Sequence, residues 1–319
     1  NGNHVQGAIL LNTLIVGDGA GSTRHTTNGT AFTNTPGAPV AQYLAQFHNK
    51  IYATNGTSSV LTTSTTGDAT AWSIGGTSDA TSLTVPDEGA AGQLMVAGDR
   101  LVISKTKGKM FNWDDYSMVD MTTRYGASSP YSAASIDDYW FYMNQIGIFG
   151  FDGANKNLIS NPIQRQFYNR ANTGIGTASW GTAPGAAHIW DYFVAVGTLT
   201  DDFTGRQINN AIIKYDYQKN LFLNWQFNDP PTAFCSYVDA NNKYQLIFGN
   251  SSGQVFQLDN TKMSDNGSPI ASEMVFLFSY AQQQQQAGQQ SALIGPGMSY
   301  QKKWNWFRIF LNPGAELNM

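Results

Sequence analysis

The chain has 319 residues, of which 41% are hydrophobic, enough to bury a large core. Only 13% are charged, and the formal net charge of −4 excludes a strongly basic surface for nucleic acid. The aromatic content of 13% argues against an intrinsically disordered chain. No apolar run reaches the roughly 20 residues of a membrane helix. A single cysteine, Cys235, excludes a disulfide framework and a cysteine-based metal site.

A two-strand unit recurs along the chain. Each copy has two short runs of β-branched and aromatic residues, bounded by turns that contain Gly, Asn, Asp or Ser. The copies start roughly 37 to 53 residues apart, a spacing typical of β-propeller blades. The six copies begin at 12, 49, 99, 138, 191 and 243.

The repeat predicts an all-β fold, a β-propeller of six blades, and its spacing is also compatible with five or seven. One β-meander has two faces to cover, so blades pack around an axis and each covers its neighbour. Additional outer strands are predicted at Ala71–Ile74 and Leu221–Phe227.

The composition is uniform along the chain, without a Pro- or Ser-rich linker, which favours one large domain. We therefore predict a propeller over 1–280 and an exposed Gln-rich loop over 281–292. The segment 293–319 contains an alternating strand at Lys302–Leu311, which could begin a further β element or pair back onto an outer blade. Because the chain starts with Asn-Gly-Asn-His and stops soon after this strand, we expect it to be part of a longer polypeptide.

The glycine-rich run Gly17–Ser22 follows an apolar strand, as a dinucleotide-binding turn does. The residues after it are poor helix formers, and that site needs a helix N-terminus, so we predict a hairpin turn. Asp residues outnumber Glu, and most lie at turns, where their side chains cap backbone N–H groups. Adjacent pairs such as Asp114-Asp115, Asp137-Asp138 and Asp201-Asp202 point to opposite faces of a strand and do not predict a catalytic dyad.

Other chemistry-bearing residues also have structural interpretations. The four histidines, which lack metal-ligand spacing, are His4, His25, His48 and His188. Cys235 has no nearby histidine and is predicted to be a small buried residue. Lys105, Lys107 and Lys109 could contact phosphate, but we favour a solvated strand edge. The sequence thus predicts no catalytic, cofactor-binding or metal-binding residue and no cofactor.

The strand-borne aromatic residues could form a sugar-binding face, but packing between blades is the favoured interpretation. These residues are Trp113, Trp140, Trp180, Trp190, Trp225 and Tyr131.

The order of the strand motifs resembles one protein family. The motifs are a Lys-rich hairpin, an aromatic hairpin with an Asn-Pro-Ile exit, a pair of strands ending in Tyr-Asp, a Trp-bearing strand and a final Gly-Gln hairpin. They occupy Asp99–Trp113, Asp138–Gly153 with Ile159–Ile163, Tyr192–Val196 with Ile212–Asp216, Asn224-Trp225, and Gly249–Asp259. In this order the chain resembles the β-propeller hub or nozzle proteins of short-tailed bacteriophages, including the packaged-DNA stabilisation type.

This resemblance implies a structural virion protein of the phage tail and not an enzyme. Related proteins form a homo-oligomeric ring, commonly a hexamer, that continues the DNA channel below the portal. The implied partners are the adaptor, a tail fibre or spike, and DNA that passes without specific binding during ejection; no membrane is implied.

Two other functions stay open at this stage. One is a carbohydrate- or receptor-binding propeller, such as a lectin or tail adhesin. The other is a propeller glycoside hydrolase, which requires two carboxylates within about 10 Å of each other at one end of the axis.

Overall fold

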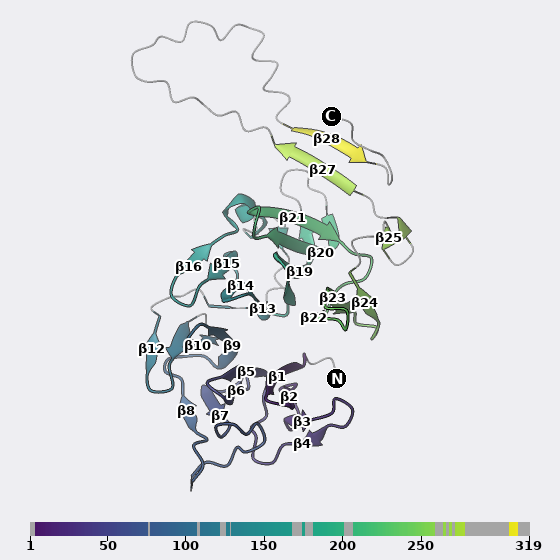
Figure 1. The fold of residues 1–319 in the computed structure, drawn as a ribbon. Helices are drawn as coiled ribbons and strands as arrows, with labels where there is room; N and C mark the ends of the chain where they lie inside the picture. The colour runs from purple at the N-terminus through teal and green to yellow at the C-terminus, as the bar shows by residue number, and fades with distance from the viewer. Residues whose placement is uncertain are drawn as a thin grey trace, which may run out of the picture. The chain divides into compact units, whose positions relative to one another are not determined.

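The structure is a computed structural model, and it confirms the predicted propeller. Six small antiparallel sheets, all within the compact unit Asn1–Leu258, form its six blades (Figure 1). The structure describes residues 4–75, 77–106, 109–121, 126–127, 129–167, 174–175, 181–200, 207–258, 264–265, 268–269, 272–277 and 306–311.

Blades 1 to 3 are four-stranded meanders in which consecutive strands pair. Blade 1 contains β1 (Gln6–Leu10), β2 (Thr13–Gly17), β3 (Arg24–Thr26) and β4 (Thr33–Asn34). Blade 2 contains β5 (Tyr43–Phe47), β6 (Lys50–Thr54), β7 (Val60–Thr63) and β8 (Ser82–Thr84). Blade 3 contains β9 (Ala91–Ala97), β10 (Arg100–Lys105), β11 (Met110–Trp113) and β12 (Met118–Asp120).

Blade 4 follows the same plan, and blades 5 and 6 vary it. Blade 4 contains β13 (Ser129–Ile136), β14 (Tyr139–Met143), β15 (Ile148–Phe151) and β16 (Lys156–Leu158), and a 3-10 helix, η1 (Asn161–Gln166), follows it. In blade 5, β17 (Gly174–Ile175) and β18 (Gly185–His188) both pair with β19 (Asp191–Thr200), which is followed by β20 (Gln207–Asp216) and β21 (Leu221–Gln226). The described strands of blade 6 are β22 (Ala233–Val238), β23 (Tyr244–Gly249) and β24 (Val255–Gln257).

The predicted two-strand units correspond to the second and third strands of the blades. The sequence pattern does not predict the innermost strands β1, β5, β9, β13, β18 and β22. Three of them, β9, β13 and β18, contain many Ala, Gly, Ser or Gln residues, which have weak strand preference. The outer strand predicted at Leu221–Phe227 is confirmed as β21. The one predicted at Ala71–Ile74 is wrong: Trp72 there is buried, and its indole N–H donates to the Ala69 carbonyl oxygen.

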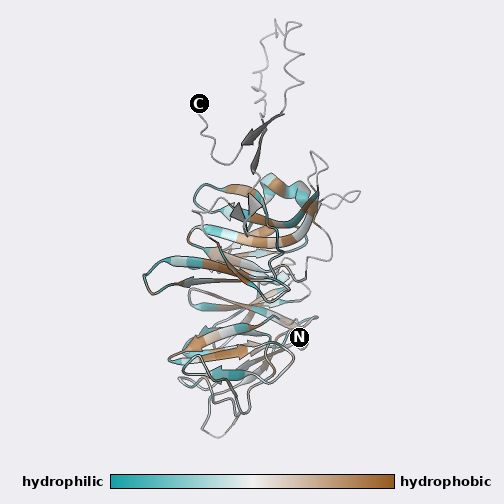
Figure 2. Ribbon diagram, turned by 90° about the vertical axis from the view of Figure 1, so that its right-hand side faces the viewer, coloured by the Kyte–Doolittle hydropathy of each residue, from teal (hydrophilic) through white to brown (hydrophobic). Residues whose placement is uncertain are grey.

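The core is divided into five clusters, and each lies between two neighbouring blades. Apolar residues gather along the strands that form these interfaces (Figure 2). Leu10 and Leu44 are in the cluster between blades 1 and 2, and Phe193 and Leu246 are in the cluster between blades 5 and 6. The other clusters join blades 2 and 3, 3 and 4, and 4 and 5. Among the described residues no sixth cluster joins blade 6 to blade 1.

The second unit, Asp259–Met319, contains four described strands. The short β25 (Ser264–Asp265) pairs with β26 (Ser268–Pro269), and β27 (Ser272–Leu277) pairs with β28 (Trp306–Leu311) in an antiparallel hairpin. A strand was predicted in the region of β28, and it is the partner of β27. The predicted Gln-rich loop at 281–292 lies outside the described residues.

Gly185 shows how closely the inner strands approach each other. A Cβ atom added to Gly185 of β18 would lie 2.5 Å from the Ser132 carbonyl oxygen of β13. We therefore expect Gly185→Ala to lower the free energy of unfolding by about 1–3 kcal/mol, because backbone must shift. The matched control is Gly181→Ala, which meets no atom within 4 Å and should change stability by less than about 1 kcal/mol. Urea unfolding measures both, and equal stability of the two variants would contradict the close approach.

Candidate functional site

The inner strands of blades 1 to 4 line a cavity at the propeller axis. Its volume is about 370 Å³, and none of its lining residues is ionisable. Gln6, Gln46 and Gln93 supply carboxamide groups, and Gln6 Nε2 donates to Gln93 Oε1 over 3.0 Å. Trp140 also lines the cavity, and its indole N–H donates to the Val96 carbonyl oxygen. This lining suits an uncharged ligand of small size.

Tyr131 of β13 joins parts of three blades. Its hydroxyl accepts a hydrogen bond from Gln42 Nε2, and its ring stacks on His4 with centroids 3.9 Å apart. The Tyr43 ring lies 5.7 Å away, and burial raises the pKa of Tyr43 well above its usual value. Burial also lowers the pKa of His4. This aromatic group therefore packs elements of blades 1, 2 and 4 together.

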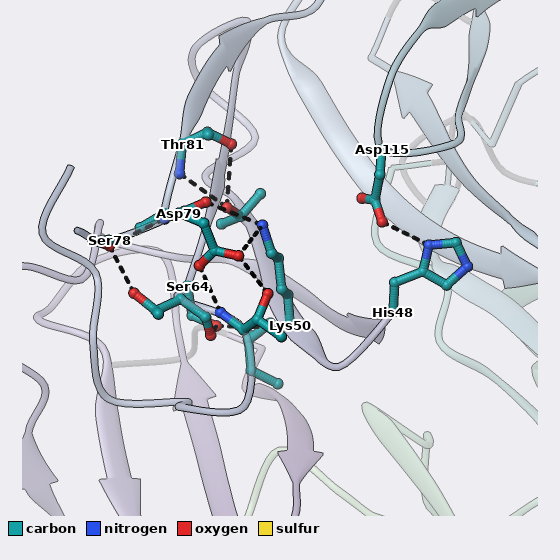
Figure 3. Close-up of polar contacts among 12 residues, drawn as sticks. His48, Lys50, Ser64, Ser78, Asp79, Thr81 and Asp115 are labelled. Atoms are coloured by element: carbon teal, nitrogen blue, oxygen red, sulfur yellow. Dashed lines mark hydrogen bonds and ion pairs between the residues drawn. The ribbon is translucent and has the colours of Figure 1, made fainter. Parts of the chain in front are cut away.

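The arrangement that most resembles a catalytic pair is His48 with Asp115 (Figure 3). His48 Nδ1 lies 2.6 Å from Asp115 Oδ2, and the same carboxylate accepts hydrogen bonds from Tyr52 Oη and Trp113 Nε1. Burial and this hydrogen bond to Asp115 raise the pKa of Tyr52 above its usual value. In the described part of the chain, no hydroxyl or thiol group hydrogen-bonds to His48. The pair therefore links blade 2 to blade 3 without the nucleophile that a catalytic triad requires.

Asp79 holds the long connection between β7 and β8 against β6. It accepts hydrogen bonds from the Thr66 backbone N–H and hydroxyl. Lys50 Nζ lies 3.2 Å from its carboxylate, and Figure 3 shows Lys50 beside Asp79. The Thr66 bonds, followed by Lys50, lower the pKa of Asp79 to about 2. Asp79, Thr66 and Lys50 thus bind one another and tie this connection to β6.

The predicted solvated edge is wrong for Lys105. The Lys105 side chain is fully buried, and its Nζ donates to the carbonyl oxygens of Val85 and Asp87 over 3.0 and 2.9 Å. The prediction was wrong for this residue because its position on β10 is buried and its ammonium group finds two backbone carbonyl acceptors there. Lys109 is partly exposed and pairs with Asp87 and Asp120, while Lys107 lies outside the described residues.

The prediction that aspartates cap turns is confirmed. Asp18 of the glycine-rich run accepts N–H groups of Ala20 and Gly21, so this run is the hairpin turn that the sequence predicts. Asp114 and Asp152 cap turns in the same way. The capping bonds lower the pKa of each of these three carboxyl groups. These carboxylates are thus acceptors in turns and not raised-pKa acids of the glycosidase kind.

The remaining candidate residues, His188 and Cys235, are not part of a catalytic or metal-binding cluster among the described residues. Among the described residues, no group of three or more His, Cys, Asp or Glu could hold a metal ion. His188 is buried, with its Nδ1 3.4 Å from Ser236 Oγ. Cys235 is exposed, contrary to the prediction, because it lies on the face of β22 that no other blade covers. Asp201-Asp202 lies outside the described residues.

Most strand-borne aromatic residues pack between blades, as predicted. Trp113 packs against the cluster of blades 2 and 3, Trp140 against that of blades 3 and 4, and Trp225 against that of blades 5 and 6. Trp190 is 41% exposed in the turn before β19, and Trp180 lies outside the described residues.

Comparison with known proteins gives the fold alone. No family model and no curated protein matches the sequence. The chain is similar to the crystal structure of BBS1N in complex with ARL6DN, with a TM-score of 0.52 and 11% identity, over 78% of this chain and 73% of that chain. At this identity the likeness supports the propeller architecture and nothing finer.

Two further structures have TM-scores below 0.5. Hsv2 from Kluyvelomyces marxianus matches with a TM-score of 0.49 and 9% identity, over 82% of this chain and 73% of that chain. The computationally designed Ika8 protein matches with 0.46 and 12% identity, over 78% and 68%. Within the described residues, the structure contains no helix long and apolar enough to cross a membrane.

The buried lysine provides a stability test. Lys105→Met should lower the free energy of unfolding by about 1–3 kcal/mol, because the Val85 and Asp87 carbonyl oxygens lose their donor. Lys109→Met removes exposed ion pairs and should lower stability less than Lys105→Met does. Chemical unfolding measures the free energy of unfolding of both variants. Equal losses in the two variants would contradict a stabilising role of the buried hydrogen bonds of Lys105.

The lowered pKa of Asp79 predicts that the stability of the folded chain depends on pH in the acid range. Its pKa is about 2 in the folded chain, below the usual 3.8, so its contribution is complete above pH 4 and is lost as pH falls through about 2. We expect Asp79→Asn to lower stability at pH 6 and to reduce the loss of stability between pH 4 and pH 2. Thr66→Val should reduce this acid loss in the same direction, since it removes a hydrogen bond to the carboxylate. If the free energy of unfolding of both variants changed with pH as that of the wild type does, Asp79 would not be the source of the acid loss of stability.

Proposed function

We propose that this chain is a structural, non-enzymatic propeller protein of a bacteriophage tail, a subunit of the nozzle or hub ring through which packaged DNA is retained and released. The observation that carries the proposal is the order of the family-like motifs along the blades. Asp99–Trp113 covers β10 and β11, Asp138–Gly153 covers β14 and β15, and Gly249–Asp259 includes β24. The motifs thus fall mainly on the second and third strands of their blades, the strands that carry the repeat.

The chemistry of the described side chains is consistent with a structural role. The carboxylates with lowered pKa cap turns or hold loops, and the His48–Asp115 pair bridges two blades. The axial cavity, at about 370 Å³, has the size of a small-ligand site and is far too small for a DNA duplex. In this proposal DNA therefore passes through the centre of a ring of copies and not through the axis of one propeller.

A weakly acidic, sparsely charged chain suits a DNA channel. Lys and Arg clusters would bind phosphates and release counterions, which would slow passage. With a net charge of −4 and only 13% charged residues, the surface offers few such sites. The ring would contact an adaptor protein and a tail fibre or spike.

A second candidate function rests on the axial cavity. Three glutamine carboxamides and the Trp140 indole are groups that bind sugars, so a carbohydrate- or receptor-binding propeller is the alternative. This alternative requires the cavity to hold an uncharged polar ligand and does not require a ring.

Electron microscopy and glycan binding separate the two functions. The nozzle proposal expects ring-shaped oligomers with an axial channel, antibody labelling at the tail of the particle, and no binding on a glycan array. A monomer in solution that is absent from particles would contradict it. Glycan binding that is lost in Trp140→Ala but kept in the matched Trp190→Ala would support the alternative instead.

A further inference from the structure

One end of the propeller is built from two kinds of turn. These turns join the first strand of a blade to the second, or the third strand to the fourth, and we call the place where they meet the turn end. His48 lies between β5 and β6, and it contacts Asp115, which lies between β11 and β12. The Tyr217 N–H, between β20 and β21, donates to the carbonyl oxygen of Trp190, between β18 and β19, over 2.9 Å. These contacts show that both kinds of turn lie at the same end.

Exposed apolar side chains gather in the turns of the turn end. Leu11 in blade 1 is 72% exposed, and Tyr116 in blade 3 is 94% exposed. In the described turns and connections of the opposite end, Val40 alone is a large apolar residue with an exposed fraction above 40%. At the turn end, the residues above this value are Leu11, Phe32, Ile74, Tyr116, Ile189 and Trp190.

Two of these residues have a backbone conformation that their side chains disfavour. Leu11 and Ile189 have φ angles of +52° and +56°, at the same position of the turn between the first and second strands. Blades 3 and 4 have Gly98 and Asp137 at this position. Such two-residue turns favour Asn, Asp or Gly, and a β-branched residue with positive φ is an outlier. The fold of one chain therefore gives no reason for Leu11 and Ile189, whereas a docked partner would give one by covering them.

The turn end is also acidic. In its described turns and the strand residues that flank them, carboxylates outnumber Lys and Arg side chains by eleven to five. Asp99, Asp137 and Asp138 are exposed, and their carboxylates form no ion pair or hydrogen bond with the part of the chain that the structure describes. These three residues lie in turns of the neighbouring blades 3 and 4. Their charges are therefore free to attract a positively charged partner.

We propose that the turn end is the docking surface for a protein whose contacting surface is rich in Lys and Arg and has apolar pockets for the turn tips. The inference deepens the proposed function and rests on it, since the partner is then the neighbouring tail protein at this end of each subunit. Complementary charge favours this occupant. The excess of carboxylates repels DNA, anionic lipid and the same end of a second copy. Exposed aromatic tips such as Trp190 and Tyr116 are the kind of side chain that anchors a protein interface.

Photo-cross-linking tests this surface. A p-benzoylphenylalanine in place of Tyr116 puts a photoreactive ring at the turn end, and the same amino acid in place of Val40 at the opposite end is the control. After irradiation of assembled particles, mass spectrometry should identify a cross-link from position 116 to a second kind of protein, within a segment rich in Lys and Arg. Position 40 should not give this product. Cross-links from position 116 to another copy of this chain, to a segment without Lys and Arg, or to nothing would overturn the proposal.

Neutral variants test the choice of a basic partner. Asp99→Asn combined with Asp138→Asn should lower the yield of the cross-link from position 116 at least threefold, because the attracting charge is lost. The matched control is Asp18→Asn combined with Asp229→Asn, which removes the same charge at the opposite end and should leave the yield unchanged. Equal yields in the two double variants would overturn the choice of a basic partner.

The strained turn of blade 5 provides an independent measurement. Ile189→Asn should raise the midpoint of thermal unfolding by about 1–3 °C, because Asn adopts a positive φ more readily than Ile does. The same variant should lower the yield of the cross-link at least fivefold, since it removes an apolar contact with the partner. Val40→Asn, a change of another β-branched residue at the opposite end, should leave the yield unchanged. An Ile189→Asn chain with the full yield would overturn the role of Ile189 in docking, and a lower midpoint would contradict the argument from its backbone.

The docking surface and the proposed function can fail separately. A chain that is absent from particles would refute the proposed function, while a cross-link from position 116 to a Lys- and Arg-rich partner in the producing cells would still support the docking surface. A ring at the tail whose position 116 cross-links to other copies alone would refute the docking surface and leave the proposed function in place.

Discussion

The packing of one blade against the next is the constraint on which this structure depends. A β-meander has side chains on both faces, and its own strands cover neither. Each of the five core clusters therefore takes residues from two blades, as Phe141 of blade 4 and Tyr192 of blade 5 do with their stacked rings. The stability of any blade is inseparable from that of its neighbours.

The same constraint determines which polar groups are free for function. Turn aspartates are occupied by backbone N–H groups, Lys105 by two carbonyl oxygens and Asp115 by three donors. Buried or half-buried polar groups need such partners, since an unpaired one costs free energy. Among the described residues, the axial cavity is lined by uncharged side chains, and apolar residues such as Val5 and Ile9 are exposed.

The second and third strands of each blade could be read from the sequence because they are rich in β-branched and aromatic residues and end in Gly, Asn or Asp turns. Asp18 and Asp152 were correctly expected to cap turns, since capping is a local interaction. The inner strands could not be found in this way. β13, for example, contains Ser, Pro and Ala, and it is a strand because its small side chains fit where the blades converge.

By itself, the sequence determined the all-β class, the repeat and its turns, because strand periodicity and turn preference act over a few neighbouring residues. Only the tertiary structure decided that Lys105 is buried, that Cys235 is exposed and that His48 meets Asp115, 67 positions away. These facts depend on which face of a strand the adjacent blade covers. That coverage comes from residues far along the chain, and no local pattern encodes it.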